Sequence, residues 1–217
     1  MSSSDQDIPQ KSSFFAKWLT PRSCTLGCLG YIAGIVTLPL AVFLFLNTPD
    51  VKKQRFLERE TNECRSCDLS NLDLSLRDWS HADFSKANLQ NTILGAAKLG
   101  DANFAEANLQ GAVLRQANLA NANFEGANLS QADFRCGGGT CTNLINTSFK
   151  NANLRGADFQ LVGFTPSGEV GLPQVDFTEA DLREANFEGA SVKGALLDQA
   201  KLCGTRMPDG TISNRDC

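Results

Sequence analysis

Alanine recurs every fifth residue between Ala82 and Phe134, and leucine or phenylalanine follows it two positions later. Successive segments read ADFSK, ANLQN, TILGA, AKLGD, ANFAE and ANLQG, and the same phase runs back to Leu69 and, with interruptions, forward to Leu202. On an extended backbone the alanine and the large residue share one face, and the Asn or Asp between them points the other way. Five residues cannot bury this apolar pair alone, so successive segments must stack into a solenoid.

These segments resemble the pentapeptide-repeat family, whose consensus is A-(D/N)-L-X-X, from Cys67 to about Leu202. The resemblance implies an all-β solenoid, a right-handed quadrilateral β-helix with four pentapeptides per coil. The spacing of Phe84, Phe104 and Phe124 by twenty residues indicates four segments per coil independently, because a residue then lies over the one twenty positions on.

Two segments break the phase, and we expect both to bulge out as loops, at residues 135–141 and 165–174. In strict register Gly139 would fall on the axis and leave a hole there, at a cost of roughly 2–5 kcal/mol. With the loops set aside, four columns of large residues run without a gap. The columns are Leu69, Leu89, Leu109, Leu129, Leu154, Leu182 and Leu202; Leu74, Leu94, Leu114, Phe134, Phe159 and Phe187; Trp79, Leu99, Leu119, Leu144, Phe164 and Val192; and Phe84, Phe104, Phe124, Phe149, Phe177 and Leu197.

Composition divides the chain into five parts. Residues 1–22 form a polar tail, 23–47 a transmembrane helix, 48–63 a short helical linker, 64–204 the β-helix and 205–217 a C-terminal cap. The linker begins with Thr48-Pro49-Asp50, where a capping residue precedes a proline at the first helical position. The cap contains Pro208-Asp209-Gly210, which is typical of a tight turn.

The predicted membrane span is the uncharged stretch of residues 24–46. As a helix it would measure about 34 Å, enough to cross a hydrocarbon core of ~30 Å. No small-x-small cleavage site follows it, which favours an uncleaved anchor over a signal peptide. Gly30 and Gly34 form a GxxxG pattern through which two copies could pair as a homodimer. Basic residues flank both ends, so charge does not orient the span.

The eight cysteines fall into four near-neighbour pairs, of which three flank or interrupt the repeats. The disulfide candidates are Cys64 with Cys67, Cys136 with Cys141, and Cys203 with Cys217. Zinc is the alternative for the CxxC pair, but the chain has one histidine and no second CxxC. Disulfides favour an oxidising compartment, and the resemblance extends to membrane-anchored cyanobacterial members of the family. We therefore expect a single-pass membrane protein with its repeat domain in the periplasm or thylakoid lumen.

The sequence contains no pattern typical of catalysis, and we expect no enzymatic activity, cofactor or metal. His81 falls in an outward corner position, and Gly137-Gly138-Gly139 lacks the Lys and Ser/Thr of a phosphate-binding loop. Residues 61–217 carry 13 Lys and Arg against 19 Asp and Glu. Without a basic stripe, nucleic acid is not an expected partner.

Two functions remain. The first is a non-enzymatic, membrane-tethered scaffold that displays a rigid β-helix to an unidentified protein partner outside the cytoplasm. Loops carry most departures from the uniform surface, so the expected contact residues are Gly137, Gly138, Gly139, Thr140, Pro166, Glu169 and Pro173. The alternative comes from the resemblance, because some family members are acidic DNA mimics that bind and protect a DNA topoisomerase.

Overall fold

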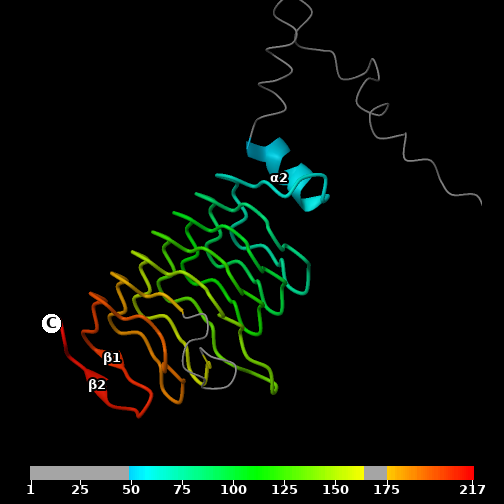
Figure 1. Cartoon of the computed structure of the whole chain (residues 1–217). Helices are drawn as coiled ribbons and strands as arrows, with labels where there is room; N and C mark the ends of the chain where they lie inside the picture. The colour runs from blue at the N-terminus through cyan, green and yellow to red at the C-terminus, as the bar shows by residue number, and fades with distance from the viewer. Residues whose placement is uncertain (1–48, 164–174) are drawn as a thin grey trace, which may run out of the picture. The chain divides into compact units, whose positions relative to one another are not determined.

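The computed structural model describes residues 49–163 and 175–217. They form a stack of similar coils with α2 (Pro49–Leu57) at one end (Figure 1). The short strands β1 (Thr205–Arg206) and β2 (Ile212–Ser213) lie at the other end. Single-residue parallel bridges join each coil to the next, as between Asn88 and Asn108. The chain is thus a β-helix solenoid, as the repeat predicts.

Each corner of a coil is a four-residue turn that starts at the large apolar residue. The carbonyl oxygen of Leu89 accepts a hydrogen bond of 3.1 Å from the N–H of Thr92, and Asn91 between them has a φ of 56°. A positive φ confined to the third residue is the mark of a type II turn, which favours Asn and Gly at that position. The last two residues of most pentapeptides are small or polar because they make this turn.

The outward Asp and Asn residues hold the backbone in place. The Asp68 carboxylate accepts a 3.1 Å bond from the N–H of Ser70, two residues on, and a 3.0 Å bond from the side-chain amide of Asn88 on the next coil. Asn108 donates in turn to Asn88, and Asn128 to Asn108. The repeat keeps Asp or Asn here because a short side chain with an acceptor satisfies a backbone N–H that the turn leaves unpaired.

The bridges between coils define the stacking register. Bridged residues are twenty positions apart up to Val113–Asp133, twenty-five apart from Asn118–Asn143 to Asp133–Asp158, twenty-eight apart from Ser148–Asp176 to Gly163–Ser191, and twenty apart again from Asp176–Leu196. These offsets are the ones that the four gap-free columns require, so the predicted register is confirmed. Gly139 is exposed and lies off the axis. Phe164, a member of the third column, lies outside the described residues.

Large side chains fill the axis of the solenoid. The rings of Phe84, Phe104, Phe124, Phe149 and Phe177 stack in sequence with centroids 4.6–5.2 Å apart. A second stack, of Phe134, Phe159 and Phe187, has centroid spacings of 4.6 and 5.0 Å. Ring edges of one stack meet ring faces of the other, as at Phe134 and Phe149. Both geometries are favourable for aromatic pairs. The rings therefore stabilise the contact of each coil with the next.

Helix α2 covers the first coil. Its Phe56 is 1% exposed, stacks on Trp79 with ring centroids 4.6 Å apart and meets the Phe84 ring edge-on at 5.2 Å. The indole N–H of Trp79 donates to the carbonyl of Leu74 at 3.1 Å. Phe56 therefore closes the end of the aromatic stack, where an open coil would expose its axis to water.

The opposite end is finished by the antiparallel pair β1 and β2, in which Thr205 lies opposite Ser213 and Arg206 opposite Ile212. A tight turn connects them, in which the N–H of Gly210 donates to the carbonyl of Met207 at 3.0 Å. Strand β1 also continues the solenoid, because Arg206 bridges Asn186 on the preceding coil.

The predicted location as a single-pass membrane protein is corrected by the structure. Within residues 49–163 and 175–217 no helix is long and apolar enough to cross a membrane. Helix α2 has nine residues and contains Asp50 and Arg55 among its charges, whereas a span needs about 20 mostly apolar residues. That finding overturns the predicted location in the periplasm or thylakoid lumen. Residues 24–46, with Gly30 and Gly34, lie outside the described part of the chain.

Candidate functional site

A short β-hairpin with a two-residue loop projects from one corner of the solenoid at residues 136–141 (Figure 1). The N–H of Gly137 donates to the carbonyl of Thr140 at 3.1 Å, and the N–H of Thr140 donates back at 3.2 Å. Gly138 and Gly139 have φ values of 60° and 84°, as a type I′ turn requires at both central positions. Gly138, Gly139 and Thr140 are exposed, so four predicted contact residues, with Gly137, meet in one protruding tip.

Cys136 and Cys141 lie at the base of this hairpin. They flank the hydrogen-bonded pair of Gly137 and Thr140 and so occupy the neighbouring, non-hydrogen-bonded position of the two strands, where Cα atoms approach to about 4.5 Å. Their Cα atoms are 4.2 Å apart, with the sulfur atoms in disulfide contact. The hairpin geometry itself brings the predicted cysteine pair together.

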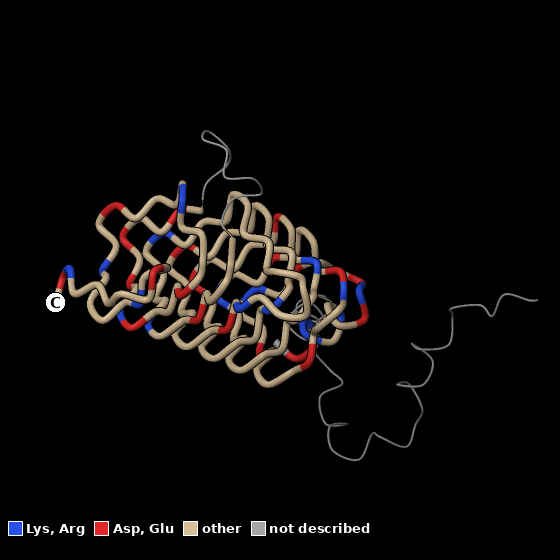
Figure 2. The backbone as a smooth tube through the Cα atoms, turned by 90° about the horizontal axis from the view of Figure 1, so that it is seen from below, with Lys and Arg blue, Asp and Glu red and all other residues tan. Residues whose placement is uncertain are grey.

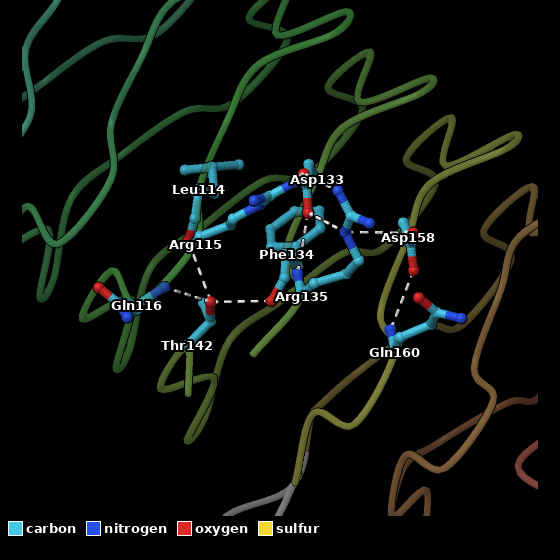
Figure 3. A network of polar contacts seen from close by, with 9 residues as sticks. All are labelled: Leu114, Arg115, Gln116, Asp133, Phe134, Arg135, Thr142, Asp158 and Gln160. Atoms are coloured by element: carbon cyan, nitrogen blue, oxygen red, sulfur yellow. Dashed lines mark hydrogen bonds and ion pairs between the residues drawn. The ribbon is translucent and has the colours of Figure 1, made fainter. Parts of the chain in front are cut away.

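Two side chains tie the hairpin to the coils. The hydroxyl of Thr142 lies 3.0 Å from the carbonyl oxygen of Leu114 and 2.9 Å from that of Phe134, and it accepts a 3.0 Å bond from the N–H of Gln116 (Figure 3). The side-chain amide of Gln116 donates to the carbonyl oxygen of Gly137. Thr142 is 1% exposed, so the return of the chain from the hairpin to the coil is fixed from inside.

An ion-pair network crosses three coils beside the hairpin (Figure 3). Asp133 receives Arg115 Nε at 2.6 Å from the preceding coil and Arg135 Nη2 at 2.9 Å from two residues on. Arg135 Nε lies 3.4 Å from a carboxylate oxygen of Asp158 on the following coil. Partial burial opposes ionisation of Asp133, but hydrogen bonds from Arg135 and Arg115 outweigh it and lower the pKa of this carboxyl to about 2.

The other two predicted cysteine pairs also lie at disulfide distance. Cys64 and Cys67 are the first and fourth residues of a corner turn, in which the N–H of Cys67 donates to the carbonyl of Cys64 at 3.2 Å. Their Cα atoms are 5.3 Å apart, and both side chains are buried. The Cα atoms of Cys203 and Cys217 are 4.8 Å apart, so the C-terminal residue lies against the last coil.

Not every residue singled out in the sequence joins this site. Pro166, Glu169 and Pro173 lie outside the described residues. His81 is exposed at a different corner, with Nδ1 3.9 Å from a carboxylate oxygen of Asp101. The hairpin is therefore the described part of the predicted contact surface.

Sequence reasoning missed the residues that fix the hairpin and the network beside it. Thr142 occupies a position where the repeat has alanine. A hydroxyl buried at this position needs a hydrogen-bond partner, so a threonine there predicts a bond to a backbone carbonyl oxygen. Thr92, Thr147 and Thr205 occupy the same position, and the hydroxyl of each bonds to a carbonyl of another coil. An arginine directly after the large residue, as at Arg115 and Arg135, also predicts an ion pair. Its side chain is long enough to reach the aspartate that precedes the large residue on the same face.

Comparisons with known proteins agree with this architecture. The family model for pentapeptide repeats matches in 8 copies, over residues 63–99, 97–135, 140–162 and 172–199. None of the curated protein sequences matches the chain.

Three solved structures illustrate the likeness. Rfr23, a pentapeptide repeat protein from the cyanobacterium Cyanothece 51142, is 20% identical with a TM-score of 0.34, over 66% of this chain and 95% of that one. AT2G44920, from the thylakoid lumen of Arabidopsis thaliana, is 26% identical with a TM-score of 0.28, over 61% and 67% of the two chains. A trypsin-treated variant of QnrB1, a plasmid-mediated fluoroquinolone resistance protein, is 20% identical with a TM-score of 0.31, over 64% and 71%.

The matched ranges together cover more than half of the sequence, and the stacked corners, Asn ladders and filled axis are what such repeats build. The chain belongs to the pentapeptide-repeat family.

Proposed function

We propose that this chain is a non-enzymatic protein-interaction scaffold whose hairpin at residues 136–141 contacts a protein partner. The observation that carries the proposal is the hairpin itself, which protrudes from the regular coils of the described residues. Binding residues are found disproportionately on loops that a rigid scaffold positions. The predicted division into a linker (48–63), a β-helix (64–204) and a C-terminal cap (205–217) is part of this proposal.

The hairpin is also suited to binding by its rigidity. The Cys136–Cys141 pair, the turn hydrogen bonds and the Gln116 anchor together hold the tip in one conformation. A tip ordered before binding loses little conformational entropy on contact, which leaves more of the interaction energy for affinity. Oxidation of all three cysteine pairs, and partner contact by Pro166, Glu169 and Pro173, belong to the same proposal.

A photo-crosslinking amino acid in place of Thr140 tests the contact directly in cells that make the full chain. We expect one dominant protein adduct from position 140. The matched control places the same probe at Ala120, which is partly exposed in a regular coil directly after the buried Leu119. Equal adducts from both positions, or none from position 140, would contradict the hairpin as the contact site.

The acidic DNA mimic remains the competing proposal, supported by the surplus of Asp and Glu in residues 61–217. Figure 2 shows Lys and Arg interspersed with Asp and Glu along the tube, and several acidic groups are paired, as Asp83 is with Arg65 at 2.5 Å. A mimic of duplex DNA needs unpaired negative charge in a regular array, which weighs against it. Inhibition of DNA gyrase supercoiling by stoichiometric protein would favour the mimic, and unaffected supercoiling would favour the scaffold.

A further inference from the structure

One face of the solenoid places apolar side chains at outward positions of its central coils. On the other three faces the residue before the large apolar one forms Asn ladders through the central coils, such as Asn118 to Asn143 and Asn103 to Asn123. On the face formed around Leu74, Leu94, Leu114, Phe134 and Phe159, which we term the Leu74 face, the corresponding positions hold Ile93 and Val113. Ile93 is 43% exposed and bridges Val113 directly.

Two columns of outward side chains run along the Leu74 face, one on each side of its buried residues. The leading column, before each buried residue, is Asp73, Ile93, Val113, Asp133 and Asp158. The trailing column, after each buried residue, is Ser75, Gly95, Arg115, Arg135 and Gln160. Over the coils of Leu94, Leu114 and Phe134 the leading column is apolar or acidic, whereas the trailing column is small or basic. On the coil of Phe187, Asn186 and Glu188 continue the two columns.

The contrast between the columns makes this face complementary to itself. A twofold axis parallel to the solenoid axis would lay the leading column of one copy over the trailing column of the other. Asp133, which already pairs with Arg115 and Arg135 of its own chain, would then lie opposite Arg135 of the second copy. Ile93 would lie opposite Gly95 of the second copy. Gly95 carries no side chain, so an isoleucine of the second copy would meet backbone at this position.

The opposite arrangement is disfavoured by charge. Two antiparallel solenoids joined about Ile93 and Val113 would set Asp73 against Asp133 of the second copy, and like charges in an interface cost free energy. Leu76, 81% exposed at the corner of the same face, adds apolar surface beside the first coil. We propose that the Leu74 face is the interface of a parallel, twofold-symmetric dimer of this chain.

A photo-crosslinking amino acid at Ser75 tests this dimer in cells that make the full chain. The control carries the probe at Ser85, the same repeat position on the opposite face; in both, the serine N–H bonds to the aspartate two residues before it. We expect a covalent homodimer from position 75 and none from position 85. The dimer should map to residues 72–76 or Ile93 of the second copy, because parallel chains bring equivalent coils together.

The double variant Ile93→Asn/Val113→Asn supplies the second arm of the test. Asn at these positions fits the ladder seen on the other faces, so the coils should keep their far-UV circular dichroism while the dimer yield from position 75 falls at least fivefold. An adduct with a different protein, equal dimer from positions 75 and 85, a contact on a distant coil, or a yield that survives the double substitution would each overturn the proposal. A dimer formed through another part of the chain would not distinguish the two probe positions.

Discussion

At the scale of single residues, Asp133 is a carboxylate held between two arginines. Its side chain is 17% exposed, and it accepts bonds from Arg115 on the preceding coil and from Arg135. These cations favour the ionised form over the protonated one, which is why the pKa falls to about 2 despite partial burial. The carboxylate therefore contributes to stability only while it is charged.

The pH dependence of unfolding tests this contribution. The pKa of Asp133 is lowered from 3.8 to about 2 on folding, so its stabilisation is complete above pH 4 and disappears as the pH falls through 2. The shift is worth roughly 2 kcal/mol. We expect the difference in unfolding free energy between the wild type and Asp133→Asn to shrink by about that amount between pH 5 and pH 1.5, measured by urea titration. Other carboxylates are common to both proteins and cancel. A difference that stays constant with pH would contradict this role.

At the scale of elements, the hairpin is an insertion of five residues between Phe134 and Leu144. Removing residues 136–140 joins Arg135 to Cys141 and restores the five-residue spacing between Phe134 and Leu144. With Cys141→Asn, the corner position receives a residue that tolerates positive φ. We expect this deletion to fold, with the far-UV circular dichroism and cooperative urea unfolding of the wild type.

A deletion one residue longer is the matched control. Without residues 136–141, four residues rather than five advance the chain from one axis position to the next, and a one-residue slip turns buried side chains outward. This variant should lose the cooperative transition of the coils that follow. If both deletions behave alike, the five-residue spacing between buried side chains is not what holds the coils together.

At the scale of the whole molecule, the solenoid is a one-dimensional array in which each coil contacts only its neighbours. The end coils therefore depend on their caps. We expect Phe56→Ala to speed amide hydrogen exchange in residues 62–80, because the ring covers Trp79 and Phe84, and to leave residues 150–160 unchanged. Phe56→Leu keeps an apolar cover and should exchange nearly as the wild type does. Mass spectrometry of exchanged peptides makes the comparison, and uniform acceleration along the chain would contradict a one-dimensional array.

The five-residue period determined the architecture, including details that looked irregular. Bridged residues are close in sequence, usually twenty positions apart, so the columns could be followed across both interruptions. The bulge at residues 135–141 followed from the same count, since it was needed to keep Gly139 off the axis. The prediction failed over the membrane location, because it depended on residues 24–46 and on the cysteines rather than on the repeat.

Tertiary structure decided what the repeat leaves free. Asp133 pairs with Arg115, 18 residues away, and with Arg135, 2 residues away. The five-residue period does not predict which outward side chains pair. Phe56 and Trp79 stack although neither follows the consensus, because the end of an array has no neighbouring coil to specify it. The sequence by itself determined which side chains enter the axis, because burial follows the period. Only the folded coils decided which surface charges pair and where Ile93 and Val113 lie, because these depend on side chains of different coils meeting in space.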